Sequence, residues 1–391
     1  MKRLRQIPYI DILAVIVGLS LAAALRYSML DFKSIDFFNY TKDWYNTLKA
    51  GGFSAFSQSF SNYNVPYLYL LYLVIRFLPD LPAVVATKIP SILSDFVMAW
   101  LVFRMVRLKY PDSPFPMFAG FAILFAPTIA LNSAFWGQAD ALYTTALVAC
   151  VYFLLVRQEA LAMIAFGISV AFKAQGVFIL PLLLALALRK ELRWRYFALV
   201  LAVLLVALVP AWLAGRSLID LLLIYPSQAG QYEQLSMHAP SAFSWIPDSG
   251  QIYNYFYPVG LFSAAAAALC YCILVYRSKT KMMPSLIVVL ASISVMLLPF
   301  ILPKMHERYF YPADVLTILL AFYRPRLFFV PIGMNIVSFF AYQPTLFGVT
   351  PVPIAALALG VLVLLIIVIR DAVRQLYPDG AQVPEEVELG A

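Results

Sequence analysis

Residues 196–214 read YFALVLAVLLVALVPAWLA, a run of 19 residues without a charged side chain. A helix of that length crosses the ~30 Å hydrocarbon core of a bilayer. Comparable runs recur along the 391 residues, which are 63% hydrophobic and 12% charged, with a mean hydropathy of +0.84. The runs are continuous rather than alternating, which excludes a soluble domain and disfavours a transmembrane β-barrel. The sequence therefore predicts an all-α, polytopic membrane protein.

About twelve spans are expected, with both ends of the chain in the cytoplasm. The net charge of +8 fits this arrangement, because cytoplasmic loops are rich in Lys and Arg, and 18 of the 28 such residues fall at the ends placed inside. The first span is interpreted as an uncleaved helix rather than a signal peptide. The predicted spans are 9–30, 84–106, 115–133, 140–156, 160–173, 176–188, 196–214, 255–276, 284–302, 309–323, 327–342 and 352–369.

The spans are expected to form one transmembrane domain, residues 1–377. The acidic tail that follows, 378–391, is predicted to be disordered. Two long connections, 31–83 and 215–254, are placed outside. Residues 66–77 are too few and too aromatic for a span, so we predict a helix that lies on the membrane surface. If this helix crossed the membrane, every later basic cluster would face outward.

Polar side chains that are unusual in such a chain fall in the segments placed outside. The stretch Lys304–Tyr309, KMHERY, sets ionisable groups between two apolar runs, where such groups usually mark a substrate or ion pathway. Acids and amides come from both long connections, from the turn at 132–140 and from a polar break at 173–176. The pattern predicts an active site at the outer membrane face that handles a phosphorylated or otherwise anionic ligand.

Four motifs carry a resemblance to a known superfamily: Asn62–Tyr69, Trp136–Asp140, Phe172–Gln175 and Lys304–Tyr309. With the order of spans and loops, they resemble the C superfamily of integral-membrane glycosyltransferases (GT-C), and locally the bacterial relatives of GPI-anchor mannosyltransferases. The resemblance covers most of residues 1–325. It implies a helical bundle whose long outer loops carry membrane-surface helices.

The resemblance also implies a function. A single sugar, mannose or a similar hexose, would pass with inversion from a polyprenyl-phosphate donor to a glycan, lipid or protein acceptor. The reaction would take place at the periplasmic or extracellular side of the plasma (inner) membrane. The acceptor hydroxyl needs a carboxylate to take its proton. We assign this role to Asp36, with Asp43 as the second candidate, although the superfamily often carries two adjacent acids and these are seven residues apart.

The departing lipid phosphate needs cations, which stabilise the charge that develops in the transition state. Phosphate binding is therefore assigned to Lys173, Lys304, His306 and Arg308. Contacts to the donor or acceptor sugar are expected from a larger set of polar and aromatic residues: Asn62, Tyr63, Trp136, Gln138, Asp140, Gln175, Gln231, Tyr232 and Glu307.

No cofactor and no nucleic-acid partner is predicted. The sequence carries no nucleotide-sugar signature, no Asp-x-Asp metal motif and no phosphate-binding Gly loop, and it leaves dependence on a divalent metal open. Two alternatives remain. A secondary transporter or flippase for a lipid-linked or anionic substrate predicts paired broken helices, and the sequence has one clear break, at 173–176. An O-antigen ligase or polymerase would use a diphosphate-linked oligosaccharide instead.

Overall fold

The structure is a computed structural model that describes residues 9–228, 233–247 and 249–378, and nearly all of its regular structure is helical. The helices and the two short strands run as follows: α1 (Tyr9–Tyr27), α2 (Lys42–Gly51), α3 (Val65–Phe77), α4 (Ala83–Lys109), α5 (Phe115–Phe125), α6 (Pro127–Ala130), α7 (Asp140–Leu155), α8 (Glu159–Phe172), α9 (Leu180–Leu188), α10 (Phe197–Leu213), α11 (Leu218–Leu222), α12 (Ile224–Gln228), β1 (Ser236–Met237), α13 (Gly250–Arg277), α14 (Pro284–Ile301), β2 (Met305–His306), α15 (Tyr311–Tyr323), α16 (Phe329–Phe347) and α17 (Ile354–Leu376).

The predicted all-helical membrane architecture is confirmed. In the described residues, six helices are long and apolar enough to cross a membrane, and α5 with the helix Pro127–Trp136 forms a seventh candidate, bent by 48°. Every predicted span coincides with a helix or with consecutive helices. Several of them, such as α7 and α8, are shorter than a full span, so the count of about twelve stays a prediction.

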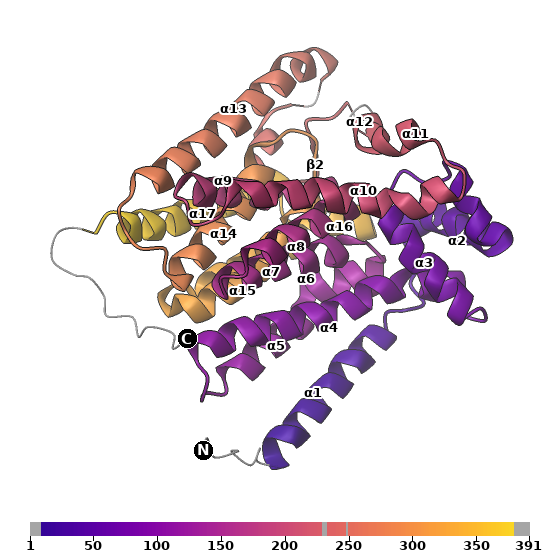
Figure 1. The fold of residues 1–391 in the computed structure, drawn as a ribbon, viewed down its shortest axis with the longest axis horizontal. Helices are drawn as coiled ribbons and strands as arrows, with labels where there is room; N and C mark the ends of the chain where they lie inside the picture. The colour runs from indigo at the N-terminus through magenta and orange to yellow at the C-terminus, as the bar shows by residue number, and fades with distance from the viewer. Residues whose placement is uncertain (1–8, 229–232, 248, 379–391) are drawn as a thin grey trace.

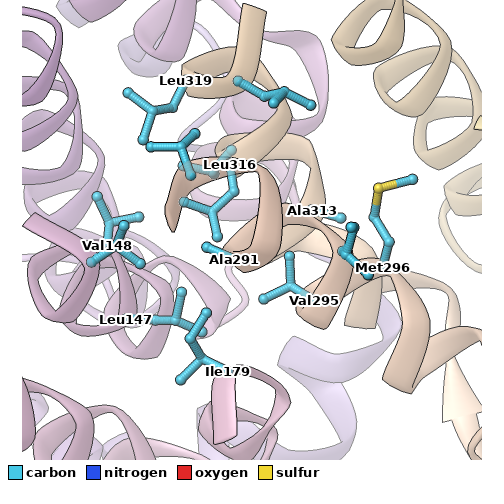
Figure 2. Packing of buried hydrophobic residues seen from close by; sticks show 14 of the residues in the cluster. Leu147, Val148, Ile179, Ala291, Val295, Met296, Ala313, Leu316 and Leu319 are labelled. Carbon is cyan, nitrogen blue, oxygen red and sulfur yellow. The ribbon is translucent and has the colours of Figure 1, made fainter. Parts of the chain in front are cut away.

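The core of the bundle is built around α14, which is apolar on all sides. A helix of this kind is stable when it is buried all round, and nearly every residue of α14 is buried. Figure 2 shows Ala291 and Val295 of α14 lying among Leu147 of α7, Leu316 of α15, and Ile179, which directly precedes α9. The helices that carry the site are thus fixed against a common apolar centre.

The first long connection, 31–83, folds into α2 and α3. Thirteen residues are too few to span, and α3 covers the predicted surface helix, 66–77. Asn64 caps it by accepting a hydrogen bond from the next backbone amide. Trp44 and Leu68 form a second core with Ala211 of α10. Figure 1 shows α2, α3, α11 and α12 gathered at the right-hand end of the bundle.

α1 lies at the edge of the bundle (Figure 1), and of its described side chains only Ala22 and Arg26 are buried. Arg26 Nε donates to Asp95 Oδ2 of α4 over 2.9 Å, and another guanidinium nitrogen donates to the Leu124 carbonyl over 3.0 Å. Losing one partner of a buried ion pair costs about 3–5 kcal/mol, because the other charge stays buried. This pair therefore fixes the end of α1 to α4 and α5.

Candidate active site

Backbone hydrogen bonds fasten the second long connection, 215–254, to the motif Lys304–Tyr309. β1 pairs in parallel with β2, and His238 forms a separate, antiparallel bridge to His306. The Lys304 amide donates to the Leu235 carbonyl over 2.8 Å. His238 and Lys304 have φ angles of 57° and 62°, which are uncommon for residues with a side chain. The ladder thus determines where the side chains of the motif point.

Asp36 is held by two side chains of the motif Trp136–Asp140. Trp136 Nε1 donates to Asp36 Oδ2 over 2.8 Å, and Gln138 Nε2 donates to the same oxygen. Ser34, two residues earlier, donates to the backbone carbonyl of Trp136 over 2.9 Å. These bonds fix the orientation of the carboxylate, as a positioned base requires.

Lys173 and Arg308 converge on one buried carboxylate, that of Asp140. Lys173 Nζ pairs with Asp140 Oδ1, and Arg308 Nε lies 3.8 Å from Asp140 Oδ2. Arg308 also pairs with the buried Glu307 over 3.1 Å. Arg308 Nε has no hydrogen-bond partner among the described residues. This nitrogen therefore faces Asp140 as an ion pair without donating a hydrogen bond to it.

Aromatic rings surround the cations of the site. Lys173 Nζ lies 5.1–5.9 Å from the ring centres of three tyrosines, and the Arg308 guanidinium lies 5.3 Å from the Trp136 ring. Lys304 Nζ lies 4.7 Å from the Tyr257 ring. Ring faces attract cations without neutralising their charge, so they position these groups and leave them able to bind an anion.

Two adjoining cavities open among these residues. The base cavity, about 250 Å³, is the one that Asp36 lines. The cation cavity, about 290 Å³, is the one that Lys173 and Lys304 line. The two share a wall made of Asn62, Tyr63, Met237, His306 and Arg308.

Most of the predicted site residues meet at these cavities. Trp136 and Asp140 are buried behind the walls, where they bind Asp36 and Lys173. Asp43 is exposed on α2 and lines neither cavity. Gln231 and Tyr232 lie outside the residues that the structure describes. The predicted residues that line one cavity or both are Asp36, Asn62, Tyr63, Gln138, Lys173, Gln175, Lys304, His306, Glu307 and Arg308.

Burial sets the charges of His306 and Glu307. It raises the pKa of the Glu307 carboxyl to about 7, although the neighbouring Arg308 lowers that pKa. It also lowers the pKa of His306, and the charges of Arg308 and Lys173 lower that pKa further. His306 is therefore neutral at pH 7, where it can exchange hydrogen bonds with a ligand but contributes no positive charge.

Sequence reasoning missed several residues that line the base cavity. Tyr40 and Trp44 lie four and eight residues after Asp36, and this helical spacing was a usable signal. Thr345, at the far end of the chain, gave no such signal. In the described part of the chain, no group of three or more His, Cys, Asp or Glu side chains is arranged to hold a metal ion. Tyr67 and Gly137 lie within the quoted motifs but were given no role, and the residues missed altogether are Asn39, Tyr40, Thr41, Trp44, Met237 and Thr345.

Two crystal structures of ArnT from Cupriavidus metallidurans are similar to this chain. The one bound to undecaprenyl phosphate has a TM-score of 0.56 and 15% sequence identity, and the match covers 92% of this chain and 77% of that chain. The apo structure has a TM-score of 0.55 and 14% identity, and the match covers 92% of this chain and 76% of that chain. At such identity the similarity establishes the fold alone, and it confirms the predicted GT-C architecture.

The family model of glycosyltransferase family 87 matches residues 63–299. This is more than half of the chain, and it includes Tyr63, the motif Trp136–Asp140 and Lys173. No curated protein sequence matches the chain. The chain is a multi-pass membrane glycosyltransferase of the GT-C superfamily, as predicted, and it belongs to glycosyltransferase family 87.

Proposed function

We propose that this enzyme transfers a single sugar from a polyprenyl-phosphate donor to an acceptor hydroxyl, with inversion at the anomeric carbon. The family supports glycosyl transfer, and the undecaprenyl phosphate bound in the similar ArnT structure supports a lipid-phosphate donor. One observation carries the proposal. A fixed carboxylate lines one cavity, a cluster of cations lines another, and the two cavities share a wall.

Each cavity takes one substrate. The acceptor occupies the base cavity, where Asp36 takes the proton of its hydroxyl as the oxygen attacks the anomeric carbon. The bond between that carbon and the phosphate oxygen breaks, and its electron pair leaves with the lipid phosphate. The phosphate occupies the cation cavity. The sugar lies against the shared wall, between the attacking oxygen and the leaving group.

The cations can exchange their present partners for the phosphate. Lys173 and Arg308 both face Asp140, and Lys304 lines the cation cavity as well. Below its pKa of about 7 the Glu307 carboxyl is neutral, so Lys173 and Arg308 then face a single negative charge, that of Asp140. The excess of positive charge stabilises the phosphate as it departs. His306 contributes a hydrogen bond.

Asp36 suits the role of base better than Asp43. It is half-buried, lines a cavity and is oriented by two donors. Asp43 is exposed and lies outside both cavities. A base has to lie within hydrogen-bond reach of the hydroxyl that it deprotonates. For an acceptor bound in the base cavity, Asp36 meets this condition and Asp43 does not.

Helix ends support a site at the outer face of the plasma membrane. α4, α7 and α15 each begin beside the site. Their opposite ends lie at or next to basic residues, Lys109, Arg157 and Arg324, and Lys109 donates to the Tyr323 carbonyl over 2.7 Å. Because basic residues concentrate at cytoplasmic ends, the site ends of these helices belong outside.

The motifs support mannose, or a similar hexose, as the sugar, and a glycan, lipid or protein as the acceptor. The family favours a transferase over a transporter or flippase. An O-antigen ligase or polymerase differs in its donor, a diphosphate-linked oligosaccharide.

Donor turnover tests the proposal. Purified enzyme is incubated with undecaprenyl-phosphate-mannose, with the corresponding glucose and arabinose donors, and with a diphosphate-linked oligosaccharide, and release of the lipid phosphate is followed. We expect turnover of at least one monophosphate-linked donor and none of the diphosphate-linked one. Turnover of the diphosphate-linked donor alone would establish the ligase alternative and refute the proposal.

A further inference from the structure

Lys88 is a buried cation that the mechanism above does not use. It lies in the second turn of α4, it is 2% exposed and it lines neither cavity. Its Nζ donates to the backbone carbonyls of Met29, Leu30 and Phe32, over 3.1, 2.8 and 2.8 Å. An ammonium group has three N–H donors, and these three carbonyls use all of them.

The carbonyls belong to the segment that connects α1 to Asp36. α1 ends at Tyr27, so these carbonyls lie just beyond the helix, outside its regular hydrogen bonding. A cation at this position is favourable. The Phe32 ring also stacks on Phe135, with ring centroids 3.7 Å apart, and Ser34 is hydrogen-bonded as described above. The chain is therefore fixed at two points within four residues of the proposed base.

The aliphatic part of Lys88 packs against Gly137, the residue between the two donors to Asp36. A Cβ atom at Gly137 would lie 3.3 Å from Lys88 Cγ, and the φ of 82° favours glycine. Ser91, one turn farther along α4, donates to the Gln138 carbonyl over 2.7 Å. One face of α4 thus holds both the segment that carries Asp36 and the segment that carries its donors.

We infer that Lys88 is a positioning residue for the transfer reaction. It holds residues 28–36 against Gly137, so that the Asp36 carboxylate meets Trp136 and Gln138 and faces the base cavity. Its action passes through the backbone, since it does not touch the cavities. Burying an ammonium group is costly, and an apolar side chain would fill this space without that cost. The inference rests on the proposed function, because it takes Asp36 as the base.

A double-mutant cycle tests the inference. Lys88→Met removes all three hydrogen bonds, and the matched control Thr87→Val removes a buried hydroxyl that bonds only within α4, to the Val84 carbonyl. We expect Lys88→Met to lower kcat for release of undecaprenyl phosphate from undecaprenyl-phosphate-mannose by roughly 10²-fold, as a misplaced catalytic group does. The donor KM should change less than about twofold, because the cations are held separately. The control should keep wild-type values.

The cycle separates this inference from the identity of the base. In the Asp36→Asn background, Lys88→Met should lower the residual rate no further, because residues that act as a unit are not additive. An equal loss in both backgrounds would overturn the inference and leave Asp36 as the base. Full turnover by Asp36→Asn alone would refute the base, and with it the inference.

Hydrogen exchange gives a readout that does not depend on the donor. Amides of residues 28–41 should exchange faster in Lys88→Met than in wild type or Thr87→Val, while those of α14 stay unchanged. Unchanged exchange at residues 28–41 would overturn the inference.

If Lys88→Met does not yield folded protein, Lys88→Arg takes its place. Arginine keeps the positive charge, but its planar guanidinium does not match three converging carbonyls. We therefore expect Lys88→Arg to have a lower kcat at an unchanged donor KM. A wild-type kcat for this variant would overturn the inference.

Discussion

Replacing Arg308 by alanine should weaken binding of the donor phosphate strongly. Its Nε is buried and has no hydrogen-bond partner in the described part of the chain, and it lies in the wall that both cavities share. A hydrogen bond to a charged group contributes about 1.5–3 kcal/mol, which corresponds to a factor of roughly 10 to 150 in Kd. Arg308→Ala should therefore raise the Kd for the lipid phosphate at least about tenfold.

Electrostatic repulsion adds to this loss. Arg308 pairs with Glu307 over 3.1 Å and lies 3.8 Å from Asp140. Without the guanidinium, only Lys173 compensates the charge of Asp140 directly, and Glu307 adds a second negative charge whenever it is ionised. Like charges at short range repel more strongly in a buried site than in water. The lower end of the range above is thus the minimum that we expect.

Binding of undecaprenyl phosphate to purified enzyme in detergent measures this effect, for example by thermophoresis. Arg324→Ala is the matched control, because Arg324 forms an ion pair of 2.7 Å with Asp371 and lines neither cavity. The control should keep the wild-type Kd. A wild-type Kd for Arg308→Ala, with folded protein, would refute the placement of the phosphate beside this residue.

Two further predictions concern charge and sidedness. Because the pKa of Glu307 is about 7, its carboxyl is neutral below that pH and ionised above it. Undecaprenyl-phosphate-mannose is a diester and does not titrate in this range. Its Kd should therefore rise as the pH increases through 7, because the ionised carboxylate repels the phosphate. Glu307→Gln should flatten this dependence, and an unchanged slope would contradict it. In a chain without Cys150, Cys270 and Cys272, an impermeant thiol reagent on intact cells should label the exposed positions Ser54→Cys and Gln234→Cys but not Lys279→Cys. If Lys279→Cys is labelled and Gln234→Cys is not, the topology is the reverse of the one proposed.

Much of the fold was predictable because each predicted span corresponds to a continuous apolar run in the sequence. Residues 196–214, for example, coincide with α10 and the turn before it. The number of crossings was not predictable in the same way. α7 and α8 are short, and whether a short apolar helix crosses depends on what it packs against rather than on its own composition.

The site was predictable as a set of motifs but not as a set of contacts. The charge pattern placed Lys173 and Arg308 on one side of the membrane, yet their common partner, Asp140, follows from how α7, α8 and α15 pack. Lys88 shows the same limit. A lysine inside an apolar span marks a special position, but the three carbonyls that it binds belong to a segment more than 50 residues earlier.

The central claim is that Asp36 is the general base, and that the cavity it lines shares a wall with the site of the donor phosphate. Turnover of undecaprenyl-phosphate-mannose, or of whichever monophosphate donor the enzyme accepts, by Asp36→Asn and Asp43→Asn tests it most directly. Loss of a positioned base lowers a rate by roughly 10²–10⁴-fold, so Asp36→Asn should lose at least a hundredfold in kcat with its donor Kd unchanged, while Asp43→Asn stays near wild type. Near-normal turnover by Asp36→Asn, together with an inactive Asp43→Asn, would contradict the account.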